Sequence, residues 1–441
     1  MRKSNHHTNR RINQTRRKVL KGATLAAGTA AVGPWVVGPK AFSSSGEVNC
    51  TIWTDYIPKS VRDDFTSATG IKVNYKELGS NEELINQMKA TKGAGVDLCS
   101  PTNNRSGQWV DLDLLQPFDY ARIANLSNLN PSMLKVGDTE WNFGGKGSHW
   151  LPFIWGTEAI GWRTDLYSPA GGVPSYGNIW QSDVEGKTMV RPHSGMLGAG
   201  LYMETIGELE PGDVWKAYKD EKTMRPVWQK ITDFCIANKS QIKLFWNDTD
   251  SQKNGFLNDG VVVGQTWDGP VLALKSEGEP VNYQAPKEGA LAWVDSLALS
   301  AASENVEQAY ELIKYVFDPK IAGKSIDVHG YNSAVLGADA HTGPAYKKNF
   351  AEAYPGDALA NLNPWPAEAQ WYADVRTEYR NKFVNARKQN LKNNNPGGGG
   401  NVNPNPPPPG PAVCLSAPPA AGNCSSIGFI IGVNHECGCP T

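Results

Sequence analysis

An alternation of strand-like and helix-like stretches near the start of the chain constrains the fold more than any other feature. GEVNCTIWTDY (46–56), IKVNYKEL (71–78) and VDLCSP (96–101) carry the β-branched, aromatic and apolar residues typical of strands. The stretch 57–70 has apolar residues at helical spacing, and Asn81 is placed to cap a second helix. This β-α-β-α-β order predicts a parallel sheet with helices on both faces, and so an α/β fold.

Aromatic and polar side chains gather where these predicted strands end. Trp53, Thr54 and Tyr56 lie at the end of the first strand, and Asn104 follows the third. Ligands of parallel α/β sheets bind beyond the carboxyl ends of the strands, where loops and helix starts meet. We therefore expect the two aromatic rings to line a cleft, and Thr54 and Asn104 to orient a ligand.

The chain continues into a second α/β region. Strands are predicted at 149–163 and 259–270, as a pair around a turn at 281–300, and as a short strand that runs into a Pro/Gly loop at 186–195; helices are predicted at 214–240 and 306–319. The sequence has no repeat of fixed period. Two α/β regions agree with the 441-residue length, which suffices for two domains with sizeable cores.

Tryptophan is unusually frequent, with 15 residues, and several stand beside a carboxylate or hydroxyl. An indole face attracts a cation by about 0.5–2 kcal/mol, and a nearby carboxylate adds charge-assisted hydrogen bonds to an ammonium group. Trp267 followed by Asp268 is the sharpest instance; the alternative is a core ring followed by a helix cap. Trp246 and Trp371 are further candidates, although a tryptophan on a helix face, such as Trp371, is more often packing.

The N-terminal segment predicts export. Residues 1–45 contain nine Lys and Arg and no acidic residue, so the rest of the chain holds 34 basic against 44 acidic side chains. Arg16 and Arg17 precede a moderately apolar run that is short for a membrane span, which is typical of a cleaved twin-arginine signal; a weak membrane anchor is the alternative. The acidic remainder argues against a nucleic-acid partner.

Motifs for catalysis or metal binding are not evident. The sequence has no Gly-x-Ser-x-Gly, no His-Glu-x-x-His, no phosphate-binding Gly-x-x-x-x-Gly-Lys-Ser/Thr loop and no Cys-x-x-Cys. Cys50, Cys99 and Cys235 are expected as buried thiols, with a Cys50–Cys99 disulfide as the alternative in an oxidising compartment. We expect no catalytic residue, no metal and no cofactor.

The C-terminal end changes composition. Residues 385–413 are rich in Asn, Gly and Pro, which predicts a disordered linker. Residues 414–441 form a tail that contains Cys414, Cys424, Cys437 and Cys439. A disulfide-linked or metal-bound knot and an accessory extension without a ligand are both compatible with this spacing.

Several segments resemble, in order, the periplasmic substrate-binding proteins of ABC importers, closest to the spermidine/putrescine-binding type. The matching pieces are TIWTDYIPKSVRDDFTSATGIKVNYKELGSNEELINQMKA, VDLCSPT, NLSNLNPSML, LPFIWGTEAIGWRTD, VVVGQTWDG, APKEGALAWVDSLAL and HGYNSAV. The resemblance covers roughly residues 46–385 and implies a type II fold of two lobes, each a sheet flanked by helices, with a hinge between them. It places 46–155 and 290–318 in an N-terminal lobe, and 156–289 and 319–384 in a C-terminal lobe.

The resemblance carries binding roles onto some positions and not onto others. Trp53, Thr54 and Tyr56 match the family's first contact loop, Trp267 matches its cleft tryptophan, and Trp246 falls where the family has an aromatic ring. Asp268, next to Trp267, fits an amine anchor, with Asp295 as a second candidate. In two places the sequence departs from the family: Asn104 replaces an aromatic residue, and VRPHSGM replaces a loop that carries carboxylates.

These departures favour a small ligand with few ammonium groups over a long polyamine. The VRPHSGM loop puts His193 where an acid is expected, and together with Arg191 it is suited to an anionic end of the ligand; the alternative is a surface histidine. We therefore expect a small amine-containing solute, polyamine-like or zwitterionic, that a monomeric periplasmic protein passes to a membrane permease. A sensor subunit for a receptor and an enzyme with His193 as base are the alternatives.

Overall fold

The computed structural model describes residues 46–387. The predicted export signal (1–45), nearly all of the predicted linker and the cysteine tail lie outside the described residues. Among the described residues one continuous mixed sheet of twelve strands is flanked by helices.

The elements have the following bounds. The strands are β1 (Glu47–Trp53), β2 (Lys72–Leu78), β3 (Leu98–Cys99), β4 (Leu115–Gln116), β5 (Leu151–Arg163), β6 (Thr188–Val190), β7 (Ile242–Phe245), β8 (Val263–Trp267), β9 (Val281–Gln284), β10 (Leu291–Ser300), β11 (Asn332–Ser333) and β12 (Asn363–Pro364). The α-helices are α1 (Lys59–Thr69), α2 (Asn81–Thr91), α3 (Ser106–Trp109), α4 (Pro131–Glu140), α5 (Pro192–Thr205), α6 (Asp213–Lys216), α7 (Glu221–Ala237), α8 (Thr249–Leu257), α9 (Asp268–Ser276), α10 (Val306–Val316), α11 (Pro319–His329), α12 (Pro344–Ala353) and α13 (Gln370–Asn385). The 3-10 turns are η1 (Asn103–Arg105), η2 (Tyr120–Arg122), η3 (Leu126–Asn128), η4 (Phe143–Gly145), η5 (Ala170–Gly172), η6 (Tyr176–Trp180), η7 (Ser182–Val184), η8 (Lys239–Gln241) and η9 (Ala338–His341).

The sheet contains two groups of parallel strands. The first strand group is β2-β1-β3, in which β1 pairs in parallel with both neighbours, as the sequence predicts. The second strand group is β8-β6-β7, in which β6 pairs in parallel with both neighbours. Each group thus places the carboxyl ends of three strands at one edge.

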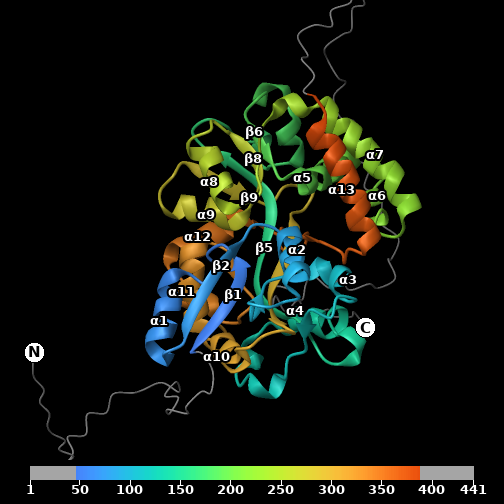
Figure 1. Cartoon of the computed structure of the whole chain (residues 1–441). Helices are drawn as coiled ribbons and strands as arrows, with labels where there is room; N and C mark the ends of the chain where they lie inside the picture. Colours follow the sequence, from blue (N-terminus) through green and yellow to red (C-terminus); the bar gives the residue numbers. More distant parts are fainter. Residues whose placement is uncertain (1–45, 388–441) are drawn as a thin grey trace, which may run out of the picture. The chain divides into compact units, whose positions relative to one another are not determined.

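Two long strands, β5 and β10, join the groups (Figure 1). They pair with each other in antiparallel fashion, β10 continues along β3, and β5 continues along β8. The predicted lobe boundary at 155/156 falls inside β5, and the one at 289/290 falls just before β10. Strands that pass from one group to the other are what a hinge between lobes requires, and the exact lobe boundaries stay a prediction.

Local sequence signals explain the first helices. Val61 and Phe65 of α1 are fully buried, and α1 ends at Gly70, whose φ of 76° is in the left-handed region that glycine adopts without strain. The prediction that Asn81 caps α2 is wrong, because the Ser80 side chain accepts from the Glu83 backbone N–H. Asn81 is instead the first residue of α2, and its side-chain amide exchanges hydrogen bonds with Thr102.

Two later predictions also need correction. The Pro/Gly stretch after β6 is not a loop but the start of α5, in which Pro192 occupies the first helical position, where its missing N–H has no cost. The strands β9 and β10 do not pair with each other; each pairs with β5. Pairing between strands that are far apart in the chain cannot be predicted from the local sequence.

The three cysteines of the described part, Cys50, Cys99 and Cys235, are free and buried. Cys50 and Cys99 lie on the paired strands β1 and β3, as expected, but the structure has no bond between them. Burial raises the pKa of both thiols, which agrees with the interpretation of these residues as small core side chains.

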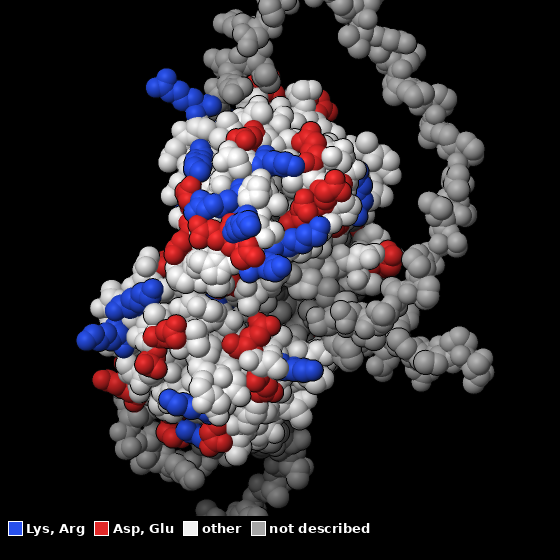
Figure 2. All heavy atoms as spheres, turned by 90° about the vertical axis from the view of Figure 1, so that its right-hand side faces the viewer, with Lys and Arg blue, Asp and Glu red and all other residues white. Residues whose placement is uncertain are grey.

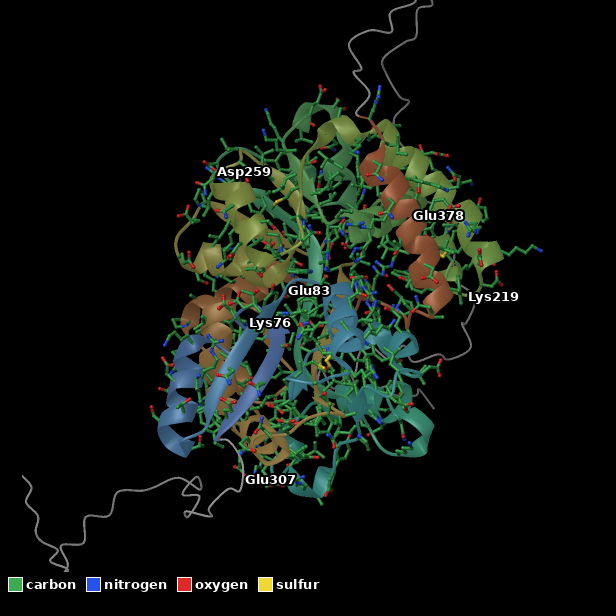
Figure 3. All side chains as sticks on the ribbon, in the orientation of Figure 1. Lys76, Glu83, Lys219, Asp259, Glu307 and Glu378 are labelled. Carbon is green, nitrogen blue, oxygen red and sulfur yellow. The ribbon has the colours of Figure 1, made fainter. Side chains whose placement is uncertain are left out.

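Charged side chains of both signs are intermingled on the face in Figure 2. Many form exposed pairs, such as Lys76 on β2 with Glu83 on α2, which are 4.0 Å apart and labelled in Figure 3. Pairs of this kind add little to stability. Within residues 46–387, no helix combines the length and apolar character needed to cross a membrane.

Candidate ligand-binding site

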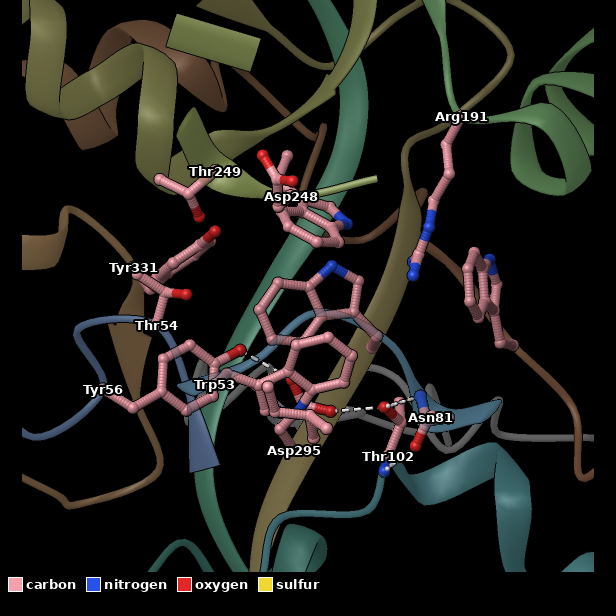
Figure 4. A pocket seen from close by; sticks show the side chains of 14 residues that line it. Trp53, Thr54, Tyr56, Asn81, Thr102, Arg191, Asp248, Thr249, Asp295 and Tyr331 are labelled. Atoms are coloured by element: carbon pink, nitrogen blue, oxygen red, sulfur yellow. Dashed lines mark hydrogen bonds between the residues drawn. The ribbon is translucent and has the colours of Figure 1, made fainter. Parts of the chain in front are cut away.

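A cavity that is partly open to solvent lies where the carboxyl ends of both strand groups meet (Figure 4). Its walls combine aromatic rings with a few polar and charged groups, as is usual for small-molecule sites. The lining residues are Trp53, Thr54, Tyr56, Leu78, Asn81, Thr102, Arg191, Asp248, Thr249, Trp267, Trp293, Asp295, Tyr331 and Trp365. The ends of β1, β2, β6, β7 and β8 all contribute, which is the position that the topology of a parallel sheet predicts.

Trp53 and Trp267 meet in this cavity from opposite strand groups. Their ring centroids are 6.1 Å apart in an edge-to-face arrangement. The indole N–H of Trp53 donates to the carbonyl of Ser100 (2.9 Å), and the Tyr75 hydroxyl donates to the Trp53 carbonyl. These bonds fix the ring at the end of β1 and leave its surface to the cavity.

The turn after β1 brings Thr54 and Tyr56 to the same cavity. Asp55 between them has φ of 62°, a left-handed conformation that short polar residues tolerate better than bulky ones. The Tyr56 backbone N–H closes the turn on the Trp53 carbonyl (3.2 Å). The predicted residues Trp53, Thr54, Tyr56 and Trp267 are therefore brought together.

Asp295 supplies a buried carboxylate at the base of the cavity. It lies on β10 beside a register shift between Asp295 and Ser296, which re-aims the side chain. Its two oxygens accept hydrogen bonds from the hydroxyls of Tyr56 (2.6 Å) and Thr102 (2.5 Å), and Asn81 donates in turn to Thr102 (2.8 Å). Burial raises the pKa of Asp295 to about 7, although the bonds from Thr102 and Tyr56 oppose this shift.

Arg191 brings a positive charge to the same cavity from the second strand group. It follows β6 and is the residue before the first turn of α5. Its guanidinium lies 5.0 Å from the ring centroid of Trp267 and 5.8 Å from that of Trp246. Burial lowers the pKa of Arg191, but an arginine remains charged at any physiological pH.

Asp268 does not line the cavity, contrary to the prediction that it anchors an amine there. It is fully buried behind the wall, where its carboxylate accepts from Asn332 (3.0 Å), from the Tyr354 hydroxyl (2.9 Å) and from the Gly269 backbone. Burial raises the pKa of Asp268 to about 7 as well. Asp268 is the first residue of α9 but does not cap it, because Trp267 holds the N-cap position and no side chain caps this helix, so the helix-cap alternative does not describe the site either.

Asn104 and Trp246 also lie outside the cavity lining. Asn104 is fully buried in η1, where its amide donates to Glu368 (3.1 Å). Trp246 is fully buried behind Trp267, with ring centroids 4.9 Å apart, and donates to the Gln265 carbonyl (2.7 Å). Both support the wall rather than face the cavity in this structure.

His193 and Trp371 likewise do not reach the cavity. His193 is in α5, not on a surface loop, and it is 6% exposed, with its ring 6.0 Å from that of Trp365. Burial lowers the pKa of His193 well below its ordinary value, and Arg376 and Arg191 add to this shift. Trp371 packs beside Tyr372 on α13, as its packing alternative states.

The sequence analysis missed several lining residues. Trp293 is one of them. It shares a face of β10 with Asp295, which the sequence analysis named as a second candidate anchor, in a period-2 pattern visible in AWVDS. Tyr331 and Trp365 come from irregular segments that carry no local signal. No group of three or more His, Cys, Asp or Glu in residues 46–387 is arranged to hold a metal ion.

Two strand groups joined by crossing strands, with a cavity at their facing carboxyl ends, define a type II periplasmic binding protein. The profile of the bacterial extracellular solute-binding protein family matches residues 60–353. The chain therefore belongs to the bacterial extracellular solute-binding proteins.

Individual relatives agree with this assignment. The spermidine/putrescine-binding periplasmic protein of Escherichia coli is 26% identical over 335 residues, 75% of this chain and 89% of the relative. Spermidine/putrescine-binding periplasmic protein 1 of Haemophilus influenzae is 28% identical over 291 residues, 65% of this chain and 74% of the relative. The solved structure of the spermidine/putrescine ABC transporter substrate-binding protein of Streptococcus pneumoniae superposes with a TM-score of 0.59 at 22% identity, covering 77% of this chain and 98% of that one; this likeness concerns the fold.

Proposed function

We propose that this protein is the periplasmic solute-binding component of an ABC importer. It captures a small amine-containing solute, polyamine-like or zwitterionic, in the cavity between the strand groups and delivers it unchanged to a membrane permease. Family membership and the relatives named for spermidine and putrescine binding support this assignment. Export by the twin-arginine route through residues 1–45, and function as a monomer, belong to the same proposal.

The observation that carries the amine assignment is the Asp295 carboxylate in an aromatic cavity. The side chain is 4% exposed, yet it lines the cavity and has no basic partner within ion-pair distance among residues 46–387. A buried carboxylate without a cation is costly, and an ammonium group with its three N–H donors offsets that cost. Trp53, Trp293 and Tyr331 around it are suited to the alkyl part and charge of an amine.

Two matched substitutions test this role, because Asp295 and Asp268 are both buried and have the same raised pKa. Mass spectrometry of solute released from protein purified without denaturation identifies the ligand for calorimetry. Asp295→Asn should weaken that ligand by about 1.5–3 kcal/mol, roughly 10- to 100-fold, the range of a hydrogen bond to a charged group. Asp268→Asn, behind the wall, should weaken it much less. Equal losses in the two variants, or unchanged affinity in Asp295→Asn, contradict the assignment.

A further inference from the structure

Arg191 is the one basic residue among the described residues that line the cavity, and the amine assignment does not use it. Its side chain lines the cavity, and the residue is 7% exposed. Among residues 46–387 no hydrogen bond and no ion pair involves its guanidinium, which lies over the faces of Trp267 and Trp246. Figure 4 shows the guanidinium extending from the second strand group into the space above Trp53.

The nearby acidic residues do not satisfy this guanidinium. Glu82 forms ion pairs with Arg105 (3.2 Å) and Arg376 (3.0 Å) instead. Glu158 is fully buried and its Oε1 accepts from Gln265 (2.9 Å); it acts electrostatically on Arg191 but forms no ion pair with it. A nearly buried guanidinium with five N–H donors therefore faces the cavity without an acceptor, which is costly unless a ligand supplies one.

The start of α5 adds positive potential at the same place. Arg191 is the N-cap residue of this 14-residue helix, whose first backbone N–H groups and dipole favour an anion. A planar carboxylate matches the fork of an arginine and accepts two bonds at once.

Opposite charges thus face one cavity without pairing with each other. Asp295 lies at one end and Arg191 at the other, and they form no ion pair, although Arg191 acts electrostatically on Asp295. Asp248 is an exposed acid at the rim, where its side chain caps α8. The second ammonium of a diamine would lie near the Arg191 guanidinium and be repelled.

From these contacts we infer that the cavity selects a solute with both an ammonium group and a carboxylate over a diamine or polyamine, with Asp295 holding the ammonium and Arg191 the carboxylate. This inference rests on the proposed function and narrows its substrate class. A solute with one carboxylate and one or two amino groups balances the charges of Asp295, Arg191 and Asp248.

Calorimetric titration with three matched series of probes tests the preference for a solute that carries both charges. The series are linear ω-amino acids, α,ω-diamines and alkylamines, each with two to six carbons. The tightest ω-amino acid should bind at least tenfold more tightly than the diamine of equal length. Arg191→Met should weaken the amino acid at least tenfold, leave the alkylamine within threefold, and remove the preference over the diamine. Arg163→Met, which removes an arginine paired with Asp165 outside the cavity, should change none of these affinities.

The outcomes separate this inference from the proposed function. A diamine that binds as tightly as the best amino acid, or an unchanged preference in Arg191→Met, overturns the inference while the amine-binding function stands. If no amino acid, diamine or alkylamine binds, the inference and the proposed amine-binding function are both contradicted. If Arg191→Met does not fold, the same titrations are made with Arg191→Lys. Lysine keeps the positive charge but lacks the planar guanidinium that can bind both oxygens of a carboxylate. A severalfold loss for the amino acid with no loss for the alkylamine supports the inference, and equal affinities contradict it.

Discussion

The raised pKa of Asp295 predicts that ligand affinity depends on pH. Burial raises its pKa to about 7 in the ligand-free protein, so the carboxyl is protonated at lower pH. An ammonium ligand needs the ionised form, and its binding must then displace a proton. We expect affinity to fall by up to about tenfold per pH unit as the pH drops from 7 to 5, measured by calorimetry. In Asp295→Asn this slope should disappear; an unchanged slope would point to Asp268, whose pKa is also about 7.

The same shift predicts the opposite trend for stability without ligand. A carboxyl whose folded pKa lies above its ordinary value of 3.8 stabilises the fold at low pH and loses that contribution as the pH rises through about 7. Asp295 and Asp268 both act in this direction. Their raised pKa values therefore favour the ligand-free fold at pH 5 over pH 8, while the ligand binds better at pH 8.

The choice between these two aspartates shows where sequence reasoning stops at the residue scale. Asp268 is adjacent to Trp267 in sequence, which suggested one joint site. Trp267 ends β8 with its ring in the cavity, while Asp268 begins α9 with its carboxylate buried among Asn332 and Tyr354. Consecutive residues at the end of a strand point to opposite sides, so sequence adjacency was the wrong guide. Asp295, two residues after Trp293, shares its face.

At the scale of elements, an ion-pair cluster joins the two strand groups. Arg105 of η1 pairs with Glu368 (3.1 Å), Arg376 of α13 pairs with Glu368 (3.3 Å), and Glu82 of α2 contacts both arginines. Helix α2 follows β2 of the first group, while α13 packs on α5 and α7 of the second. Burial alone would raise the pKa of Glu82, but Arg105 and Arg376 lower it well below its ordinary value.

Glu368 is the member whose loss should matter most, since it and both arginines are nearly inaccessible. Glu368→Gln leaves two buried guanidinium groups short of negative charge, so we expect the free energy of unfolding to fall by about 3–5 kcal/mol, measured by chemical denaturation. Glu378→Gln on α13 is the matched control, because Glu378 pairs with Arg225 and Lys382 on the surface and should change stability far less. Similar losses of unfolding free energy in the two variants would show that the buried cluster contributes no more to stability than the surface pairs do.

The elements themselves were predictable where their signals are local. The β1-α1-β2-α2-β3 order follows from side-chain periodicity, and the buried face of α10 (Ala309, Leu312, Ile313 and Val316) follows from helical spacing. Helix α5 was missed because Pro192 and Gly195 are typical of loops, yet proline is favoured at a helix start. The pairing of β9 and β10 with β5, and the approach of Glu368 to Arg105, depend on contacts between residues far apart in the sequence.

At the scale of the whole molecule, the cavity is completed only when the two strand groups approach each other. Trp53 and Thr102 come from the first group and Arg191 and Trp267 from the second, while Asp295 lies on the crossing strand β10. The direct contact of Trp53 with Trp267 and the Glu82–Arg376 pair both cross between the groups. We therefore expect a solute to enter while these contacts are apart and to be enclosed when they form.

Binding should consequently shift the population toward the closed arrangement, because only that state offers contacts from both groups at once. We expect saturating ligand to lower the radius of gyration of the full chain, measured by small-angle X-ray scattering. At the lowest concentration that saturates the unaltered protein, Asp295→Asn should stay closer to the ligand-free value, since we expect it to bind roughly 10- to 100-fold more weakly. A radius that does not change on binding in the unaltered protein would mean that β5 and β10 do not act as a hinge and that the solute enters a cavity already closed.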